Sequence, residues 1–203
     1  MKTITIGIVD YGMGNHASIV NSLRELGFRV RISKVSSELD LVDVLLLPGV
    51  GAFPAAMRAL CGQGLDGYLQ EQMRLQRPIV GFCLGMQLLA SASYEHEYTL
   101  GLNMIPGEIV AFAGHGWHIG WNTLERMQHD PLLDPSVGQA FYFNHSFYYR
   151  GPKEYQIAVA RHSEEFAAVI RCGNALGFQF HPEKSQSAGK VLLKNLITGL
   201  VRA

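Results

Sequence analysis

The first part of the chain alternates short apolar runs with segments of helical spacing. Residues 5–9, TIGIV, are a β-branched run that ends at Asp10 and a turn with two glycines, which is typical of a buried parallel strand. Residues 15–26 follow with aliphatic side chains at helical spacing, and Gly27 closes the segment. This pattern predicts one strand, turn and helix.

The same alternation continues through the first half of the chain. Apolar runs predict three more strands, at residues 28–33, 42–47 and 79–82. Residues 55–75 have helical composition with glycine interruptions, and residues 84–92 have it again after the fourth strand. Strands that alternate with helices predict an α/β fold, with a largely parallel sheet that helices cover on both faces.

The second half is richer in strands and aromatic residues. Residues 117–122, WHIGWN, and 140–149, AFYFNHSFYY, have the composition of strands, and we expect antiparallel hairpins added to the sheet here. A further strand is predicted at residues 176–180 and an amphipathic helix at 189–201. Because the sequence has no internal repeat, low-complexity tract or linker, we expect one domain over residues 1–203, with a mixed, mostly parallel central sheet.

Composition narrows the possible partners. The 203 residues include 17 lysines and arginines and 17 aspartates and glutamates, so no net charge draws the chain to nucleic acid, anionic lipid or a basic protein. No apolar run approaches the roughly 20 residues needed to span a bilayer, and the first residues meet charge and glycine too early for a secretory signal. We expect a cytoplasmic protein that binds neither nucleic acid nor membrane.

The three cysteines differ in their surroundings. They form no CxxC pair, so a reducing compartment is expected rather than a disulfide scaffold. Free cysteine usually packs as a small hydrophobe, and we expect buried structural roles for Cys61 and Cys172. Cys83 instead lies in the stretch GFCLGMQLL, residues 81–89, where a predicted strand gives way to a predicted helix.

The Gly-x-Cys-x-Gly frame around Cys83 matches a strand-to-helix nucleophile elbow. Flanking glycines permit a strained turn that lifts the central side chain clear of the sheet. At a helix N-terminus the exposed N–H groups favour thiolate over thiol, and the N–H of Leu84 would face an oxyanion formed by attack. These features favour a nucleophile, while the frame alone leaves a buried structural thiol as the alternative.

A thiol nucleophile needs a base, and His181 is the best placed of the eight histidines. It follows the predicted strand LGFQF, and Glu183 comes two residues later. At a strand end the two side chains can lie on one face, so that the carboxylate fixes the imidazole tautomer. The carboxyl edge of a parallel sheet would bring them to Cys83. A surface His-Pro-Glu turn is the alternative for this tripeptide alone.

Two glycine-rich loops follow other predicted strands. PGVG, residues 48–51, could complete an oxyanion hole through its N–H groups, or form only a tight turn. GMGNHA, residues 12–17, satisfies the GxGxx(G/A) dinucleotide fingerprint and raises the alternative of a nucleotide-binding module without enzymatic activity. Such a module needs an acidic residue about 20 positions on, where the chain reads RISKVS, with Glu38 only later. We therefore interpret Gly12 and Gly14 as a turn.

Together these motifs give the chain a strong resemblance to a known family. GFCLGMQ, PGVG and FQFHPEKS resemble the class I, triad-type glutamine amidotransferases. YGMGN, LPGVGAF, HIGWN and YFNHS resemble, more narrowly, the glutaminase subunits of imidazole glycerol phosphate synthases, and the match runs in order through nearly the whole chain. The resemblance implies a flavodoxin-like three-layer fold and a site without cofactor or metal.

The resemblance also implies an activity and roles for three residues. Glutamine would be hydrolysed to glutamate and ammonia, with Cys83 attacking the side-chain amide. His181 would move protons, and Glu183 would orient His181. Nothing in the sequence resembles an acceptor-substrate site, so the ammonia would pass to a second protein.

The family's oxyanion hole and glutamine pocket map onto the loops already described. A flip in the PGVG loop would place the N–H of Val50 or Gly51 beside that of Leu84 to form the oxyanion hole. Backbone groups would make much of the contact with glutamine. The pocket positions are Gly49, Gly51, Leu84, Gln87, His145, Ser146 and Phe147.

The implied second protein is a (βα)8-barrel cyclase subunit, bound as a heterodimer. It would make imidazole glycerol phosphate and the aminoimidazole carboxamide ribotide in histidine biosynthesis. Trp121, Tyr142 and Lys184 match positions that the family places at the interface. Core packing is the alternative for Trp121 and Tyr142.

Three residues depart from the family pattern near the expected pocket. Trp117 stands where proline is usual, Asn144 replaces an aliphatic residue and Phe147 replaces a tyrosine. These departures leave open a paralogue that supplies ammonia to another synthetase, such as one that amidinates a bacterial surface sugar.

Overall fold

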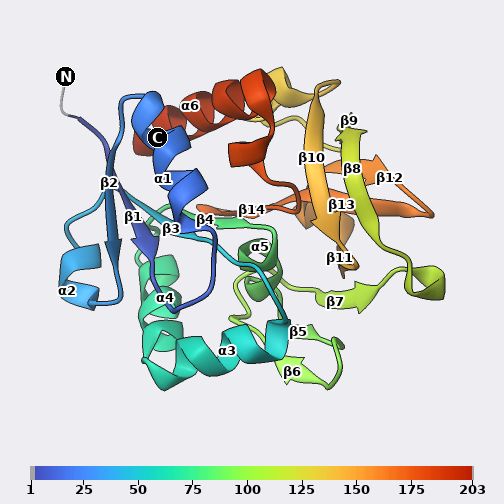
Figure 1. The fold of residues 1–203 in the computed structure, drawn as a ribbon, viewed down its shortest axis with the longest axis horizontal. Coiled ribbons are helices and arrows are strands. Elements are labelled where there is room, and N and C mark those ends of the chain that lie inside the picture. Colours follow the sequence, from blue (N-terminus) through green and yellow to red (C-terminus); the bar gives the residue numbers. More distant parts are fainter. Residues whose placement is uncertain (1–2, 203) are drawn as a thin grey trace.

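An eight-stranded mixed sheet runs through the centre of the computed structural model, which describes residues 3–202 (Figure 1). The strand order is β2-β1-β3-β4-β14-β13-β12-β9. The first five strands are parallel: β2 (Arg29–Ser33), β1 (Thr5–Val9), β3 (Val44–Leu47), β4 (Ile79–Phe82) and β14 (Ala175–Phe178). The other three are antiparallel: β13 (Glu165–Cys172), β12 (Gln156–Arg161) and β9 (Glu125–Arg126). The predicted mixed, mostly parallel sheet is confirmed.

Helices cover both faces of the sheet, which gives three layers (Figure 1). One face carries α1 (His16–Glu25) and α6 (Gln186–Arg202); the other carries α3 (Phe53–Gly62), α4 (Leu65–Arg74) and α5 (Leu84–Leu88), and the short α2 (Ser36–Leu39) follows β2. Alternation along the strands builds both layers of core, because Val44 and Leu46 join the core beneath α1 and α6 while Leu45 and Leu47 join the other. Within residues 3–202 no helix is long and apolar enough to cross a membrane.

Two smaller sheets lie outside the central one. The first is a two-stranded antiparallel ribbon of β8 (His118–Thr123) and β10 (Ala140–His145). The second contains β11 (Phe147–Arg150), β7 (Glu108–Ala111), β5 (Ala92–Ser93) and β6 (Thr99–Leu100). Short 3-10 helices complete the chain: η1 (Ala113–His115), η2 (Asp134–Ser136), η3 (Lys153–Tyr155) and η4 (Pro182–Lys184). The central sheet therefore does gain antiparallel strands from the second half of the chain, β9, β12 and β13. The aromatic segments 117–122 and 140–149, which were predicted to join it, form the smaller sheets instead, so that prediction is wrong.

Three predicted helices differ in extent from those in the structure. The segment 55–75 forms two helices, because Gly64 adopts a left-handed φ of 68° between them. The helix after Cys83 ends at Leu88, since the chain then enters β5, and the last helix begins at Gln186. These shifts leave the topology unchanged.

The parallel strands fix the place of a site. The chain leaves β1, β3, β4 and β14 at their carboxyl ends, which lie along one edge of the sheet. Tyr11, the 48–51 loop, Cys83 and His181 follow these four ends. Open α/β sheets bind ligands at this edge.

Candidate active site

Cys83 occupies the turn between β4 and α5 in a conformation that few residues adopt. Its φ of 52° and ψ of −110° lie where a residue with a Cβ is strained. The turn is held at both ends, because the Cys83 N–H donates to the Phe178 carbonyl over 2.7 Å and the Cys83 carbonyl accepts from the Gln87 N–H over 3.1 Å. The residue is 8% exposed, so the thiol is reached through a pocket.

Close packing explains both glycines of the Gly-x-Cys-x-Gly frame. A Cβ on Gly81 would lie 2.5 Å from the carbonyl oxygen of Gly85, and a Cβ on Gly85 would lie 1.9 Å from that of Leu47. The main chain of β3, β4 and the turn therefore packs too closely at both positions to admit any side chain. The frame that indicated a nucleophile is a packing requirement of this turn.

His181 and Glu183 lie together after β14. The His181 Nδ1 is 2.9 Å from Glu183 Oε1, and the side chains are 6% and 2% exposed. The carboxylate accepts, so Nδ1 carries the proton and Nε2 is left for another partner. Burial by itself lowers the pKa of His181, but hydrogen bonds and charge interactions with Cys83 and Glu183 outweigh it and raise the pKa to about 9.

A pocket of about 300 Å³ opens beside Cys83. The loops after β3 and β4, the end of β10 and the segment after β14 meet around it. Its lining consists of Val50, Gly51, Cys83, Leu84, Gln87, Glu95, Trp117, Asn144, His145, Ser146, Phe147, His181 and Lys184. This pocket thus brings together the cysteine and the histidine that sequence patterns singled out, with Glu183 behind the histidine.

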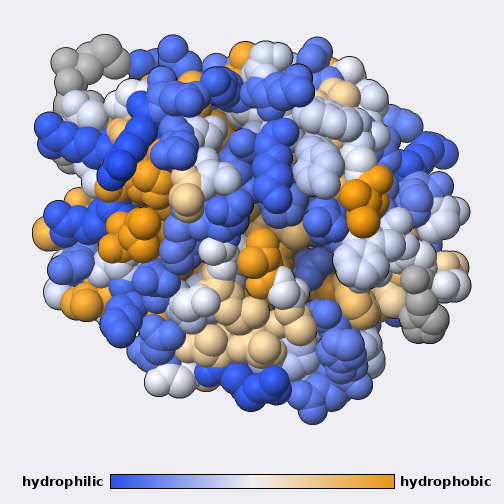
Figure 2. Space-filling view, in the orientation of Figure 1, coloured by the Kyte–Doolittle hydropathy of each residue, from blue (hydrophilic) through white to orange (hydrophobic). Residues whose placement is uncertain are grey.

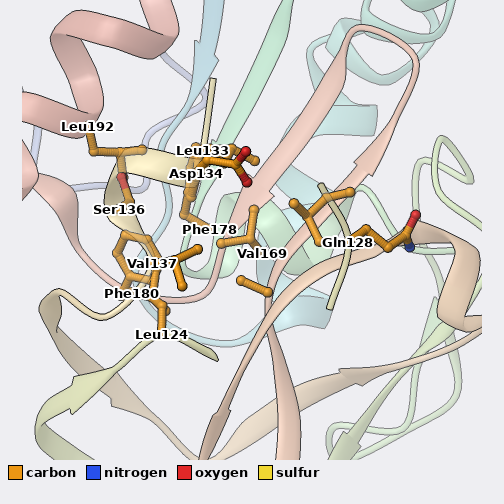
Figure 3. A pocket seen from close by; sticks show the side chains of 12 residues that line it. Leu124, Gln128, Leu133, Asp134, Ser136, Val137, Val169, Phe178, Phe180 and Leu192 are labelled. Atoms are coloured by element: carbon orange, nitrogen blue, oxygen red, sulfur yellow. The ribbon is translucent and has the colours of Figure 1, made fainter. Parts of the chain in front are cut away.

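A second cavity lies away from these residues. Figure 3 shows Val169, Phe178 and Phe180 converging with Leu133 on an apolar gap beneath the segment around η2. Its volume is about 10 Å³, roughly what one water molecule needs. It cannot hold an amino acid.

Six of the seven predicted glutamine-pocket residues line the pocket: Gly51, Leu84, Gln87, His145, Ser146 and Phe147. Gly49 is not in the lining, because it is packed behind the wall: a Cβ there would lie 2.8 Å from both Leu84 Cβ and the Tyr11 hydroxyl. Val50, predicted for the oxyanion hole, lines the pocket and is 43% exposed.

The side-chain amide of Gln87 is used inside the protein. Its Nε2 donates to the Phe147 carbonyl over 2.9 Å and to Gln179 Oε1 over 3.2 Å. Gln179 is fully buried and its own Nε2 lies 4.0 Å from Cys83 Sγ. Gln87 therefore fixes the backbone of the pocket wall as well as facing its interior.

Tyr11 anchors the PGVG loop. Its hydroxyl donates to the Pro48 carbonyl over 2.7 Å, and burial raises the pKa of Tyr11, which keeps the hydroxyl protonated. A Cβ on Gly14 would lie 3.1 Å from the Pro48 ring, so the glycine turn also packs against this loop. The segment that resembled a dinucleotide fingerprint supports the pocket.

A chain of hydrogen bonds leads from the β8–β10 ribbon to the pocket wall. His145 Nδ1 lies 2.9 Å from the Phe147 carbonyl, His145 Nε2 lies 3.1 Å from His118 Nδ1, and His118 Nε2 lies 3.3 Å from the Asn122 amide nitrogen. Asn122 also donates to the Arg161 carbonyl over 2.7 Å. Since a carbonyl can only accept, every donor points from Asn122 toward Phe147, with both rings neutral.

Burial keeps these two rings neutral. It lowers the pKa of His145 to about 3 and that of His118 to about 4. His162 stacks on His118 with ring centroids 4.7 Å apart. Among residues 3–202, however, no group of three histidine, cysteine or acidic side chains is placed to hold a metal ion.

Glu95 is a pocket residue that the sequence did not reveal. It is 8% exposed and lines the pocket, and its Oε2 accepts from the Phe53 N–H over 2.7 Å. A buried carboxylate facing a cavity can bind a cation such as an ammonium group. Its segment, SYEHEY, is an ordinary polar loop in sequence.

Two of the three predicted interface residues, Trp121 and Tyr142, lie on the outward face of the ribbon. This outer ribbon face consists of Trp117, just before β8, and Ile119 and Trp121 of β8, with Tyr142 and Asn144 of β10 opposite. Trp117, Ile119 and Trp121 are 63%, 60% and 50% exposed, so core packing is wrong for Trp121. In Figure 2 a small hydrophobic patch, coloured orange, lies over β8 among paler side chains. Lys184 lines the pocket, and its Nζ lies 5.9 Å from the centre of the Tyr142 ring.

The other two cysteines lie elsewhere. Cys172 is half-buried, and Cys61 is exposed, so the predicted burial of Cys61 is wrong. It follows Leu60, the last buried residue of α3, and therefore faces solvent. Partial burial and a hydrogen bond to Asp66 raise the pKa of Cys61, which favours its unreactive thiol form.

Comparison with solved structures supports the fold. A glutamine amidotransferase from Thermotoga maritima superposes with a TM-score of 0.73 at 14% identity, covering 100% of each chain. PurLQS from the same organism gives a TM-score of 0.77 at 16% identity, covering 98% of this chain and 100% of that one.

Comparison of sequences goes further. A protein of Listeria monocytogenes named imidazole glycerol phosphate synthase subunit HisH is 42% identical over 193 residues, which cover 93% of each chain. Subunit HisH of Carboxydothermus hydrogenoformans is also 42% identical, covering 93% of this chain and 96% of the relative. The model of the family described as glutamine amidotransferase class-I matches residues 7–199. With this match spanning the strained cysteine turn and the His181–Glu183 pair, the chain belongs to the class-I glutamine amidotransferases.

Proposed function

We propose that this protein is the glutaminase subunit of an imidazole glycerol phosphate synthase. It hydrolyses glutamine to glutamate and ammonia and delivers the ammonia to a cyclase subunit in histidine biosynthesis. One observation carries the proposal: Cys83, on its strained turn, shares a pocket with His181, whose Nδ1 is bound to Glu183. The names of the relatives at 42% identity support the choice of synthase.

The pocket suits an amino acid with a polar side chain. The Glu95 carboxylate receives the α-ammonium group, since it is the buried negative charge of the lining. Backbone groups of Ser146 and Phe147, a segment that Gln87 holds in place, bind the α-carboxylate. The side-chain amide then extends to Cys83.

The first half-reaction forms a thioester. The Cys83 sulfur attacks the amide carbon of glutamine, and the carbonyl oxygen becomes an oxyanion that accepts hydrogen bonds from the N–H of Leu84 and of Val50 or Gly51. His181, protonated next to Glu183, gives a proton to the leaving nitrogen. The C–N bond breaks, ammonia leaves and a γ-glutamyl thioester remains on Cys83.

The second half-reaction restores the enzyme. His181, now neutral, takes a proton from a water molecule that attacks the thioester carbon. The same N–H groups stabilise the second oxyanion. The C–S bond breaks, glutamate is released, and the thiolate and protonated imidazole are regenerated.

The outer ribbon face supplies a docking surface for the cyclase. Its exposed tryptophans and Ile119 form an apolar surface beside the pocket, as expected of a protein interface. Trp121, Tyr142 and Lys184 contact the partner in this proposal. Lys184 also lines the pocket, so the interface begins where ammonia leaves.

The proposal is tested with Cys83→Ala in the complex of the full-length protein and its cyclase. Glutamine-dependent product formation should disappear, whereas ammonia-dependent formation by the cyclase should persist. Cys61→Ala is the matched control and should retain glutamine-dependent activity. Unchanged glutamine-dependent activity in Cys83→Ala would show that another group is the nucleophile.

Labelling gives a second readout of the same thiol. A glutamine-analogue electrophile should modify Cys83 much faster than Cys61 or Cys172, as measured by peptide mapping. A label found chiefly on either of the other two cysteines contradicts the assignment.

A further inference from the structure

The edge of β10 that faces away from β8 contacts both Cys83 and His181. The Tyr142 carbonyl accepts from the His181 N–H over 2.9 Å, and the Asn144 carbonyl lies 3.8 Å from Cys83 Sγ. Residues 142 and 144 are two apart, so these carbonyls point from the same edge of the strand. The other edge pairs with β8. β10 therefore contacts the backbone of the histidine and the sulfur of the cysteine.

A side-chain hydrogen bond secures the end of this strand. Trp117 Nε1 donates to Asn144 Oδ1 over 3.0 Å. Asn144 pairs directly with Ile119, so Trp117 is its diagonal neighbour on the same face of the ribbon. The backbone ladder ends at the pair of His145 and His118, and the bond lies at this end, beside the pocket. It supports β10 where backbone pairing stops.

Both partners of this bond line the pocket although they lie at the surface. Trp117 is 63% exposed. Asn144 accepts the indole bond with its side chain, while its carbonyl lies beside Cys83. An exposed indole would otherwise sample several rotamers, and the bond to Asn144 selects one. The two positions that stood out in the sequence are thus one structural unit.

We propose that Trp117 is a positioning residue for glutamine hydrolysis, which acts through Asn144 to hold the end of β10 against Cys83. The indole does not touch the reacting atoms. It fixes the Asn144 side chain, and the Asn144 carbonyl keeps its place beside the sulfur. The same ring walls one side of the pocket. The inference rests on the proposed glutaminase function and adds a residue to it.

Three variants test the bond and the wall separately. Trp117→Phe keeps an aromatic wall and removes the donor, and Asn144→Val keeps a strand-forming side chain and removes the acceptor. The double variant removes nothing more of the bond. Thr123→Val is the control, because Thr123 lies at the far end of β8, opposite Ala140, and outside the pocket.

The measurement is steady-state glutamate release by the full-length protein at saturating cyclase, so that weaker docking through the outer ribbon face does not lower the rate. Each substitution should lower kcat roughly 5-fold, the size of one net hydrogen bond, with KM changed less than about 2-fold. The double variant should match the singles, because both lose the same interaction. Trp117→Ala should raise KM in addition, since it also removes the wall. Thr123→Val should match the unsubstituted protein.

Several outcomes would overturn the inference. Losses that multiply to roughly 25-fold in the double variant would mean that the two residues act independently. A fall in melting temperature with unchanged kcat would mean a purely structural bond. If the unsubstituted protein releases no glutamate with its cyclase present, the proposed function itself fails, which is a distinct result.

Discussion

Removing the hydroxyl of Tyr11 is the sharpest test of how the PGVG loop is held. In Tyr11→Phe the ring keeps its place, but the Pro48 carbonyl loses a donor at 2.7 Å inside the core. A buried acceptor left without its partner costs about 1–3 kcal/mol. For a chain of this length, a loss of about 2 kcal/mol lowers the melting temperature by about 4–8 °C.

The same substitution should reduce catalysis. Val50 and Gly51 lie two and three residues after Pro48. In the proposed mechanism, a loop that is free to move presents its N–H groups less often to the oxyanion. Complete loss of one such donor costs about 100-fold or more in kcat, so we expect about 10-fold for a loosened loop. Glutamate release by the protein with its cyclase measures kcat, and calorimetry measures stability.

Tyr149→Phe is a matched control. Tyr149 is also buried, and its hydroxyl also donates to a proline carbonyl, that of Pro106, away from the pocket. It should lose similar stability and keep its kcat. Equal losses of kcat in both variants, or full kcat in Tyr11→Phe, would refute the link between Tyr11 and the loop.

Three further predictions follow from packing and charge. Glu183→Gln should move the alkaline limb of the kcat/KM profile below about pH 9, because the carboxylate helps to raise the pKa of His181; an unmoved limb contradicts this. The pKa of His145 is about 3 in the folded protein, so below pH 6.5 this ring takes up a proton in the unfolded chain before it does so in the folded one. Urea titrations should therefore find the free energy of unfolding about 2 kcal/mol lower at pH 5 because of this ring. His145→Gln should show a smaller pH dependence. Gly85→Ala should prevent folding, because the added methyl group would clash with a main-chain oxygen. Gly67→Ala has open space in α4 and should raise the melting temperature. Equal melting temperatures for the two variants would contradict this packing.

Local patterns were sufficient for the parallel half of the fold. The strand predicted at residues 79–82 has the same bounds in the structure, because four apolar residues buried on both faces leave little ambiguity. The ribbon of β8 and β10 was harder, since an alternating strand does not specify which sheet it joins. Its inward residues Phe141 and Phe143 pack beside Phe180, and this long-range contact is absent from any local pattern.

The site divides in the same way. Cys83 stood out because its turn is encoded by adjacent glycines, and His181 and Glu183 because they are two residues apart. Glu95 and Tyr11 act through partners 42 and 37 positions away, Phe53 and Pro48, and no nearby residue signals either contact. Residues whose surroundings are local in sequence were predictable, and those that support the loops from a distance were not.

The directional hydrogen bonds from Asn122 to Phe147 give the pocket wall an all-or-none character. Each ring nitrogen along the path is already committed as donor or acceptor. Turning the Asn122 amide would put two acceptors face to face, and adding one proton to a ring would put two donors face to face. The mismatch cannot be absorbed where it arises and passes from partner to partner. The backbone of the pocket wall is thereby sensitive to the orientation of one amide, which is bound to the Arg161 carbonyl on β12.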